Sequence, residues 1–186
     1  MSLQILLRLV RSARSGWSKS LLTLTGLLAL AALVRVVPVW ATPSFGQVAQ
    51  TLAFGVAEGG VSGHMQVNKN SNGKVAPWQL QLQAQGDTDY HVLRLVVSSG
   101  GHSGWHSHPG LLVGAVTSGQ VDFYNANCEK RTILANQVYT EDDAVHAIVN
   151  SGSVDAELYL TFLVKHGAAR RLDEPAPACA GETPIP

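Results

Sequence analysis

Apolar and polar residues alternate along much of the chain after residue 42, and this alternation predicts β-strands. Residues 78–85, WQLQLQAQ, alternate without a break, as in a strand that has one face in water. Further strands are predicted between Gly-, Ser- and Asn-rich turns, at residues 90–98, 111–117, 120–124, 131–139, 145–149 and 157–164. No stretch in this region keeps the 3.6-residue period of an amphipathic helix. Short strands at this spacing predict an all-β sandwich or barrel.

The two ends of this region are patterned more weakly. Residues 42–77 form a Gly-rich arm with weak strand signals near 49–56 and 63–67. Residues 169–186 read as an irregular, Pro-rich tail. We therefore expect one barrel domain at 78–168, between this arm and this tail.

The first 41 residues have the pattern of a secretory signal peptide. They carry five basic side chains and no acidic one, residues 21–34 are uncharged and apolar, and small Ala41 follows Val39 by two positions. We expect cleavage near Ala41 and a periplasmic or secreted domain. The alternative is an uncleaved N-terminal helix that anchors the protein in a membrane through residues 21–40, although Arg35 interrupts this run.

The composition fits a folded domain after this segment. Hydrophobic residues make up 46% of the chain and charged residues 14%, which excludes a wholly disordered protein. After residue 41 there are eight basic and thirteen acidic side chains, a net charge of −5. The absence of a basic stripe in this sequence argues against a nucleic-acid partner.

Two cysteines, Cys128 and Cys179, lie far apart in the sequence, and neither belongs to a CxxC motif. In an oxidising compartment such a pair forms a disulfide more often than a metal site. We expect a bridge that ties the tail to the domain by closing a loop of about 50 residues. The alternative is two unrelated thiols.

Three histidines carry the candidate chemistry. His106 and His108 are two residues apart, so they share one face of an extended segment. His146 lies near the start of another predicted strand, and Asn150 follows it on the same face. Three imidazoles on two strands would hold one divalent ion and leave positions open for water or a ligand. We therefore predict a metal site made of His106, His108 and His146.

These residues resemble the two motifs of the cupin family. The first motif reads G-x5-H-x-H-x3-4-E-x6-G, and here Gly100, His106, His108 and Gly119 stand at its positions, with Leu112 in place of the Glu. The second motif ends in H-x3-N, which His146 and Asn150 match, whereas the Pro and Gly that precede it in the family are absent. Residues 104–110, GWHSHPG, look like the small exported cupin-domain proteins of bacteria, and the similarity covers roughly residues 78–180.

The resemblance implies a double-sheet jelly-roll barrel that holds a divalent metal ion (Fe, Mn, Zn or Ni) on three His and one Glu. Leu112 cannot be a ligand, so three imidazoles would hold the ion with water completing its shell. Glu141, Asp142 and Asp143 are expected to form a solvated turn. The alternative is that one of them turns inward and replaces the missing carboxylate.

Other side chains are candidates for the pocket or for orienting the ligands. Asn150 would orient a ligand or a substrate, and Tyr124 would offer a hydroxyl group. Trp105 either walls the pocket or anchors its loop in the core. His102 lies in a predicted Gly- and Ser-rich loop at 98–104 and is expected at the surface.

Cupins have many activities, so the fold does not select one. We expect an exported cupin that binds one metal ion and acts on, or binds, a small molecule; an enzyme of this kind would be dioxygenase- or isomerase-like. The alternative is a non-catalytic small-molecule-binding or structural cupin with a degenerate metal site. A membrane would be contacted only through an uncleaved N-terminal segment. The strand at 78–85 could lie at a sheet edge where two copies pair as a homodimer.

Overall fold

The computed structural model describes residues 41–67 and 78–185, and the structural statements below concern these residues. In chain order they form β1 (Phe45–Ala57), β2 (Gly60–Val67), β3 (Trp78–Gln85), β4 (Thr88–His102), β5 (His106–Ser107), β6 (Gly110–Ser118), β7 (Gln120–Asn125), β8 (Lys130–Leu134), β9 (Val138–Glu141), β10 (His146–Val149), β11 (Ala156–Lys165), β12 (Leu172–Asp173) and the short 3-10 helix η1 (Ala180–Glu182). The signal or anchor helix expected at 1–41 lies outside them, apart from Ala41. Within the described ranges, no helix is long and apolar enough to cross a membrane.

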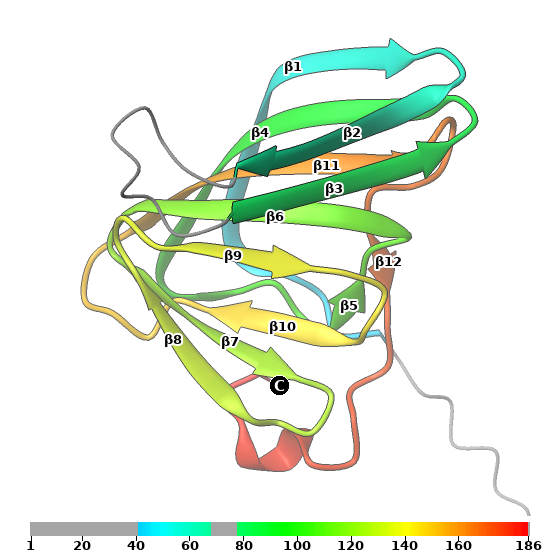
Figure 1. Ribbon diagram of the computed structural model, residues 1–186. Helices are drawn as coiled ribbons and strands as arrows, with labels where there is room; N and C mark the ends of the chain where they lie inside the picture. The colour runs from blue at the N-terminus through cyan, green and yellow to red at the C-terminus, as the bar shows by residue number, and fades with distance from the viewer. Residues whose placement is uncertain (1–40, 68–77, 186) are drawn as a thin grey trace, which may run out of the picture. The chain divides into compact units, whose positions relative to one another are not determined.

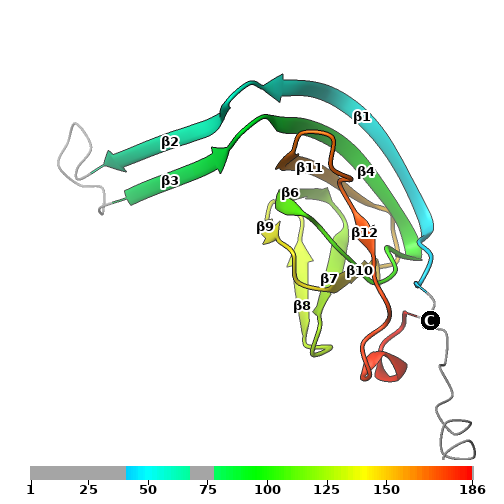
Figure 2. The ribbon, with the colours of Figure 1, turned by 90° about the vertical axis from the view of Figure 1, so that its right-hand side faces the viewer.

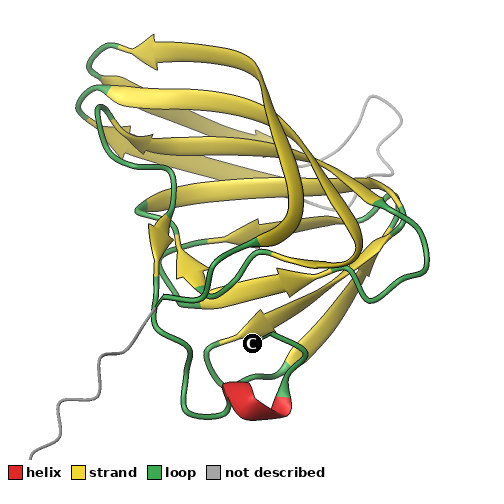
Figure 3. Ribbon diagram, turned by 180° about the vertical axis from the view of Figure 1, so that it is seen from behind, coloured by secondary structure: helices red, strands yellow, loops and turns green. Residues whose placement is uncertain are grey.

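Ten of the strands form one antiparallel sheet that curves into a nearly closed barrel (Figure 1). The strand order is β12-β5-β10-β4-β11-β6-β9, with β1 beside β4, β7 beside β10, and β8 beside β7. Strands and loops make up almost all of the described chain (Figure 3). The predicted all-β barrel is therefore confirmed, with its strands joined by hydrogen bonds into one continuous sheet.

Alternate residues of the central strands fill the barrel. On β4, Leu93, Leu95 and Val97 are buried, whereas Arg94 between them pairs with Glu157 of β11. The same alternation runs along β11, which lies antiparallel to β4 from Ala156 to Lys165. Period-2 burial of this kind is what a sheet with one covered face requires.

The boundary between arm and barrel does not lie at residue 78, where it was expected. β1 pairs with β4 along its whole length and belongs to the barrel sheet. Residues 78–85 form β3, which pairs with β2 in a separate two-stranded sheet. Figure 2 shows this β2–β3 hairpin extending away from the barrel. Alternation predicted the strand at 78–85 correctly, but it could not say which element covers the apolar face, and Trp78 and Leu80 are about half exposed.

The Gly- and Ser-rich stretch at 98–104 is mostly strand, not the predicted loop, because β4 continues to His102. Its glycines permit close approach of neighbouring chain segments. A Cβ on Gly101 would lie 2.9 Å from the carbonyl oxygen of Gly46, and one on Gly104 would lie 2.0 Å from that of Thr42. Gly104, which follows the end of β4, also has a φ of +68°, so glycine is favoured there both by the crowding of backbones and by a left-handed conformation.

A second, smaller core lies between the barrel and the tail. Fully buried Trp105 belongs to it, with Tyr124, Ala147, Val149, Ala180 and Ile185. Cys128 packs against this core and forms a disulfide with Cys179, so the predicted bridge is present in the structure. The Cα atoms of the two cysteines are 6.1 Å apart. The tail is thus held to the barrel both covalently and by apolar packing.

Candidate metal centre

The segment that carries His106 and His108 is held between two strands. β5 pairs with β10, which places His106 beside His146, and with β12 of the tail, which places His106 beside Asp173. Ser107 points the other way and donates a hydrogen bond to Glu174 at 2.8 Å. The two histidines therefore share one face, as their spacing predicts, and the third histidine lies next to them.

Four buried side chains converge at this point. The nearest ligand atoms of His106, His108, Glu141 and His146 all lie within 4.8 Å of one another. Each of these residues is no more than 5% exposed. The ring centroids of His106 and His146 are 4.4 Å apart, and those of His108 and His146 are 5.1 Å apart. The three predicted histidines are thus brought together, with one carboxylate among them.

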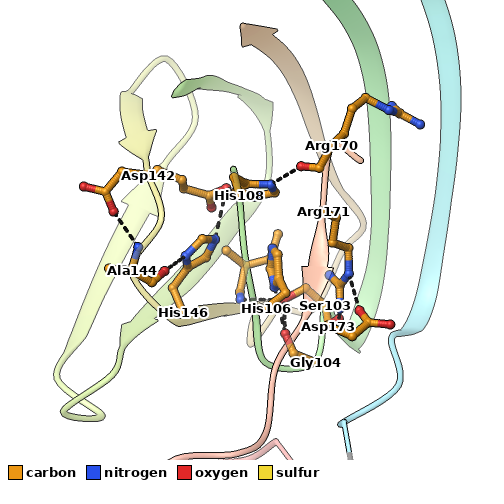
Figure 4. A network of polar contacts seen from close by, with 12 residues as sticks. Ser103, Gly104, His106, His108, Asp142, Ala144, His146, Arg170, Arg171 and Asp173 are labelled. Atoms are coloured by element: carbon orange, nitrogen blue, oxygen red, sulfur yellow. Dashed lines mark hydrogen bonds and ion pairs between the residues drawn. The ribbon is translucent and has the colours of Figure 1, made fainter. Parts of the chain in front are cut away.

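Every histidine in this cluster uses Nδ1 for a backbone carbonyl. His106 donates to Gly104 at 3.0 Å, His108 to Arg170 at 2.6 Å and His146 to Ala144 at 2.7 Å (Figure 4). A carbonyl only accepts, so each Nδ1 carries a proton. In the neutral rings the lone pair is then on Nε2, which is available to the cluster. This is the arrangement by which proteins fix the orientation of metal-binding imidazoles.

The carboxylate comes from Glu141, where a solvated turn was expected. Asp142 and Asp143 are exposed, but Glu141 is buried at the end of β9. On this strand the inward positions are Tyr139 and Glu141, which alternate with exposed neighbours. The prediction of a solvated turn was wrong for Glu141, because three consecutive acidic residues suggested exposure to water. The alternative, that one of these acids turns inward and replaces the missing carboxylate, is the one that the structure shows. The period of the preceding strand residues was the signal that could have identified it.

Glu141 is directly opposite Leu112 in the pairing of β6 with β9. Leu112, 1% exposed, stands where the cupin motif has its Glu and lines the same pocket. Opposite residues in an antiparallel pair have Cβ atoms only about 5 Å apart. The carboxylate missing from one strand is therefore supplied by the facing strand.

The charges in the cluster are strongly coupled. Burial by itself raises the pKa of Glu141, but the interactions with His108 and His146 outweigh it and lower this pKa to about 2. Burial lowers the pKa of His146, but its interaction with Glu141 outweighs burial, so that pKa is raised. The pKa of His106 is well below its usual value, mainly because of burial. Glu141 is thus ionised and His106 neutral at neutral pH.

This set of donors fits a divalent metal ion. Oε2 of Glu141 is 2.9 Å from Nε2 of His108 and 3.3 Å from Nε2 of His146, and without a metal ion a proton on the imidazole is shared across these contacts. A cation can take the place of that proton. His146 Nε2 makes no well-formed hydrogen bond to any described residue. A cation at the centre would satisfy all four groups at once, and three imidazoles with one carboxylate suit Fe, Mn, Zn or Ni.

A pocket of about 370 Å³ adjoins the cluster. Its walls are mostly apolar, with Leu93, Leu95, Ile148, Leu160 and Phe162 among the lining residues. Its polar lining includes Gln47 of β1 and the consecutive Arg170 and Arg171 of the tail. The strand β1 and the tail, both outside the expected barrel boundaries, therefore help to form the site.

Of the four expected pocket residues, Leu112 lines the pocket and the other three do not. Trp105 and Tyr124 belong to the second core, so Trp105 anchors its segment. The side-chain amide of Asn150 bonds to the carbonyls of Val97 and Val154, which stabilises the turn after β10. His102 is 7% exposed on β4, which corrects its expected surface position, and it is not part of the cluster.

No family model matches the chain, and no curated protein matches it. Among solved structures, it is similar to the cupin_2 domain of an XRE-family transcriptional regulator from Enterobacter cloacae, at 16% identity and a TM-score of 0.39, covering 63% of this chain and 96% of the other. It is also similar to the polyketide cyclase RemF from Streptomyces resistomycificus, at 11% identity and a TM-score of 0.46, covering 79% and 89%.

An oxalate oxidase in complex with glycolate is similar at 19% identity and a TM-score of 0.41, and this chain spans about half of that one, 52%. The nearly closed antiparallel barrel, with the H-x-H segment and its partner histidine inside it, is thus similar to cupin barrels and agrees with the resemblance of its motifs to that family.

Proposed function

We propose that the barrel binds one divalent metal ion through His106, His108, Glu141 and His146, and that it acts on or binds a small molecule in the adjoining pocket. The observation that carries this proposal is the convergence of four buried ligand atoms within 4.8 Å, beside a pocket. The backbone carbonyls that hold the three Nδ1 atoms support it further, because they leave each Nε2 directed at the same point.

The residues of this chain would have distinct parts in such a site. Glu141 supplies the one negative charge of the cluster and remains ionised because its pKa is about 2. The histidines are held in one orientation by Gly104, Ala144 and Arg170, so little reorganisation is needed on binding. These four residues would hold a divalent ion, which would supply Lewis-acid chemistry to a bound oxygen-bearing molecule.

The experiment is a metal analysis of the full chain, produced in an oxidising compartment and measured by elemental mass spectrometry. We expect about one ion per chain. The double variant His106→Ala/His108→Ala should lose it. A matched control is His64→Ala, because His64 is exposed on β2 of the outlying hairpin. Failure to bind after soaking with Fe, Mn, Zn and Ni, or retention of metal by the double variant, would overturn the proposal.

A non-catalytic binding protein is the second candidate, and one feature of the pocket favours it. Outside the cluster, the titratable side chains among the described lining residues are Tyr139, Arg170 and Arg171. Burial holds the pKa of Tyr139 well above its usual value, so it is not a base at neutral pH. A loaded protein that binds small molecules without converting any of them in oxygen-dependent and isomerase assays would support this candidate.

We propose that the domain is exported, and the Cys128–Cys179 disulfide supports this because such bonds persist in oxidising compartments. Fractionation of producing cells, with N-terminal sequencing of the product, tests it. A soluble exported product that begins near residue 42 indicates cleavage, and an intact product in the membrane fraction indicates an anchor. An intact product in the cytosol contradicts export.

A further inference from the structure

The residues that line the pocket carry more positive than negative charge. Arg170 and Arg171 bring two positive charges, and Glu141 is the one carboxylate among the described lining residues. Glu141 is engaged by His108 and His146, so it does not neutralise either arginine. A bound divalent ion would add further positive charge. A concave site with this excess attracts anions.

Arg171 lies next to the His/Glu cluster that is proposed to bind the metal ion (Figure 4). Its Nη2 donates to the carbonyl oxygen of Ser103 at 2.8 Å, and its Nε donates to Asp173 at 2.7 Å. Asp173 is 61% exposed, so water weakens this ion pair. The remaining N–H groups of the guanidinium can bind another acceptor, and their fork geometry suits a carboxylate. Arg171 is therefore oriented by the protein and still able to bind an anion.

Arg170 is oriented differently. Its guanidinium carbon lies 5.8 Å from the ring centre of Phe162. Figure 4 shows its side chain directed away from the histidines, whereas its backbone carbonyl accepts the hydrogen bond of His108. Arg170 adds positive charge to the pocket, but Arg171 is the arginine beside the cluster.

A second donor in the pocket has no acceptor. Nε2 of Gln47 is buried and has no hydrogen-bond partner among the described residues. A buried N–H without an acceptor is costly, and an oxygen of a ligand would remove that cost. Both the unsatisfied amide of Gln47 and the free N–H groups of Arg171 would donate hydrogen bonds to a ligand that has several acceptor oxygens.

The apolar walls specify the rest of the ligand. Leu93, Leu95, Leu160 and Phe162 line the pocket, whose volume of about 370 Å³ suits a small organic molecule. An inorganic anion such as phosphate has no part that would gain from these walls. The lining thus combines three members of the His/Glu cluster, an arginine with free N–H groups and an apolar surface.

We infer that the site binds small organic carboxylates, with the charged group on Arg171, another oxygen at the metal cluster, and the apolar part against the leucine and phenylalanine walls. This inference rests on the proposed metal site and adds the chemical class of the ligand.

The test is calorimetric titration of the full chain loaded with Co²⁺, using acids and their uncharged amides of nearly equal size. The probes are lactate with lactamide, mandelate with mandelamide, and inorganic phosphate. We expect at least one acid to bind about tenfold or more tightly than its amide, because a charge-assisted hydrogen bond is lost in the amide. That acid should also bind more tightly than phosphate.

Variants assign the preference to Arg171. Arg171→Gln should bind acid and amide alike, and Arg171→Lys should keep part of the preference because it keeps the charge. Arg94→Gln is the matched control, since Arg94 lies on the outer face of β4 and pairs with Glu157. It should behave like the unmodified protein.

The outcomes separate this inference from the metal proposal. Metal content is measured first for every variant, and an unmodified chain that takes up no ion overturns the metal site and this inference with it. A loaded chain that binds acids and amides equally, that binds none of the probes up to about 10 mM, or that prefers phosphate overturns the ligand class alone. Survival of the preference in Arg171→Gln at full metal content overturns the assignment to Arg171.

Discussion

Leu112 and Glu141 illustrate how a side chain on one strand can take the place of a side chain on the facing strand. The two side chains are opposite each other on β6 and β9, and both line the pocket. A cross-strand pair of this kind brings either side chain to nearly the same place. We therefore expect that the carboxylate of the site can come from either strand.

This equivalence leads to the first prediction. We expect Glu141→Leu to weaken metal binding by at least about tenfold, because it removes the one anionic ligand. The double variant Leu112→Glu/Glu141→Leu should recover part of that loss. Metal affinity measured by competition with a chelator checks this. A double variant that binds no more tightly than Glu141→Leu would show that the two positions are not interchangeable.

A second residue pair controls stability as a function of pH. His166 follows β11, and its Nδ1 is 2.7 Å from Asp89 at the start of β4. The hydrogen bond from His166 lowers the pKa of Asp89 below its usual 3.8, and the same bond raises the pKa of His166 above its usual 6.5. The backbone N–H of Gly167 also donates to Asp89.

The sign of the second prediction follows from these shifts. The lowered pKa of Asp89 stabilises the fold above about pH 3.8, and this contribution is lost as the pH falls through that lowered value. The raised pKa of His166 stabilises the fold below about pH 6.5, and this contribution is lost as the pH rises through the raised value. The coupling of His166→Gln with Asp89→Asn should thus be larger near pH 5.5 than near pH 8.5. Urea unfolding of the four proteins measures it, and equal coupling at both pH values would contradict the assignment.

Among the elements, the two-residue strands β5 and β12 hold the histidines of the H-x-H segment in place. The tail strand β12 pairs with the strand that carries His106, and the carbonyl of Arg170 holds His108. Glu174 accepts a hydrogen bond from Ser107 in the same segment. The tail is in turn held by the Cys128–Cys179 bridge. The orientation of the two histidines therefore depends on a segment that follows the barrel.

The third prediction concerns this bridge. We expect Cys128→Ser/Cys179→Ser to lower the free energy of unfolding by about 2–4 kcal/mol, because the bridge spans 51 residues of chain. Metal affinity should fall as well, since the tail no longer holds β5 as firmly. Urea unfolding followed by circular dichroism, with chelator competition, measures both quantities. Reduction of the unmodified protein should reproduce the losses, and unchanged stability would show that the bridge contributes little.

At the scale of the whole molecule, the β2–β3 hairpin is separate from the barrel that holds the site. The last residue of β1, Ala57, pairs with the first residue of β4, Thr88. The two strands could therefore be joined directly by a short turn. The hairpin leaves Met65, Trp78 and Leu80 about half exposed. Pairing of two copies through the strand at 78–85 stays a prediction.

The fourth prediction uses this separation. Replacing residues 58–87 with Asn-Gly should join β1 to β4 by a two-residue turn, because this dipeptide suits such hairpins. We expect the barrel to keep its melting temperature to within a few degrees and its metal content. Calorimetry and metal analysis test this, and sedimentation shows whether the hairpin also joins two copies. A shortened chain that does not fold would mean that the hairpin stabilises the barrel.

Some features could be predicted from the sequence because they depend on local order. The alternation in 157–164 and its neighbours predicted the strands, since side chains on a strand alternate between two faces. The two-residue spacing of His106 and His108 predicted their common face for the same reason. The disulfide followed from there being only two cysteines.

Other features depended on contacts between distant segments, so the tertiary structure alone decided them. Sheet pairing placed β1 in the barrel and residues 78–85 outside it, because alternation does not name the partner strand. The fold also buried Glu141 opposite Leu112 and brought Arg171 to the cluster. Local order along the chain was thus enough to predict the class of fold and three of the four cluster residues. The carboxylate and the residues that line the pocket could not be predicted in this way, because strand register and the path of the tail place them.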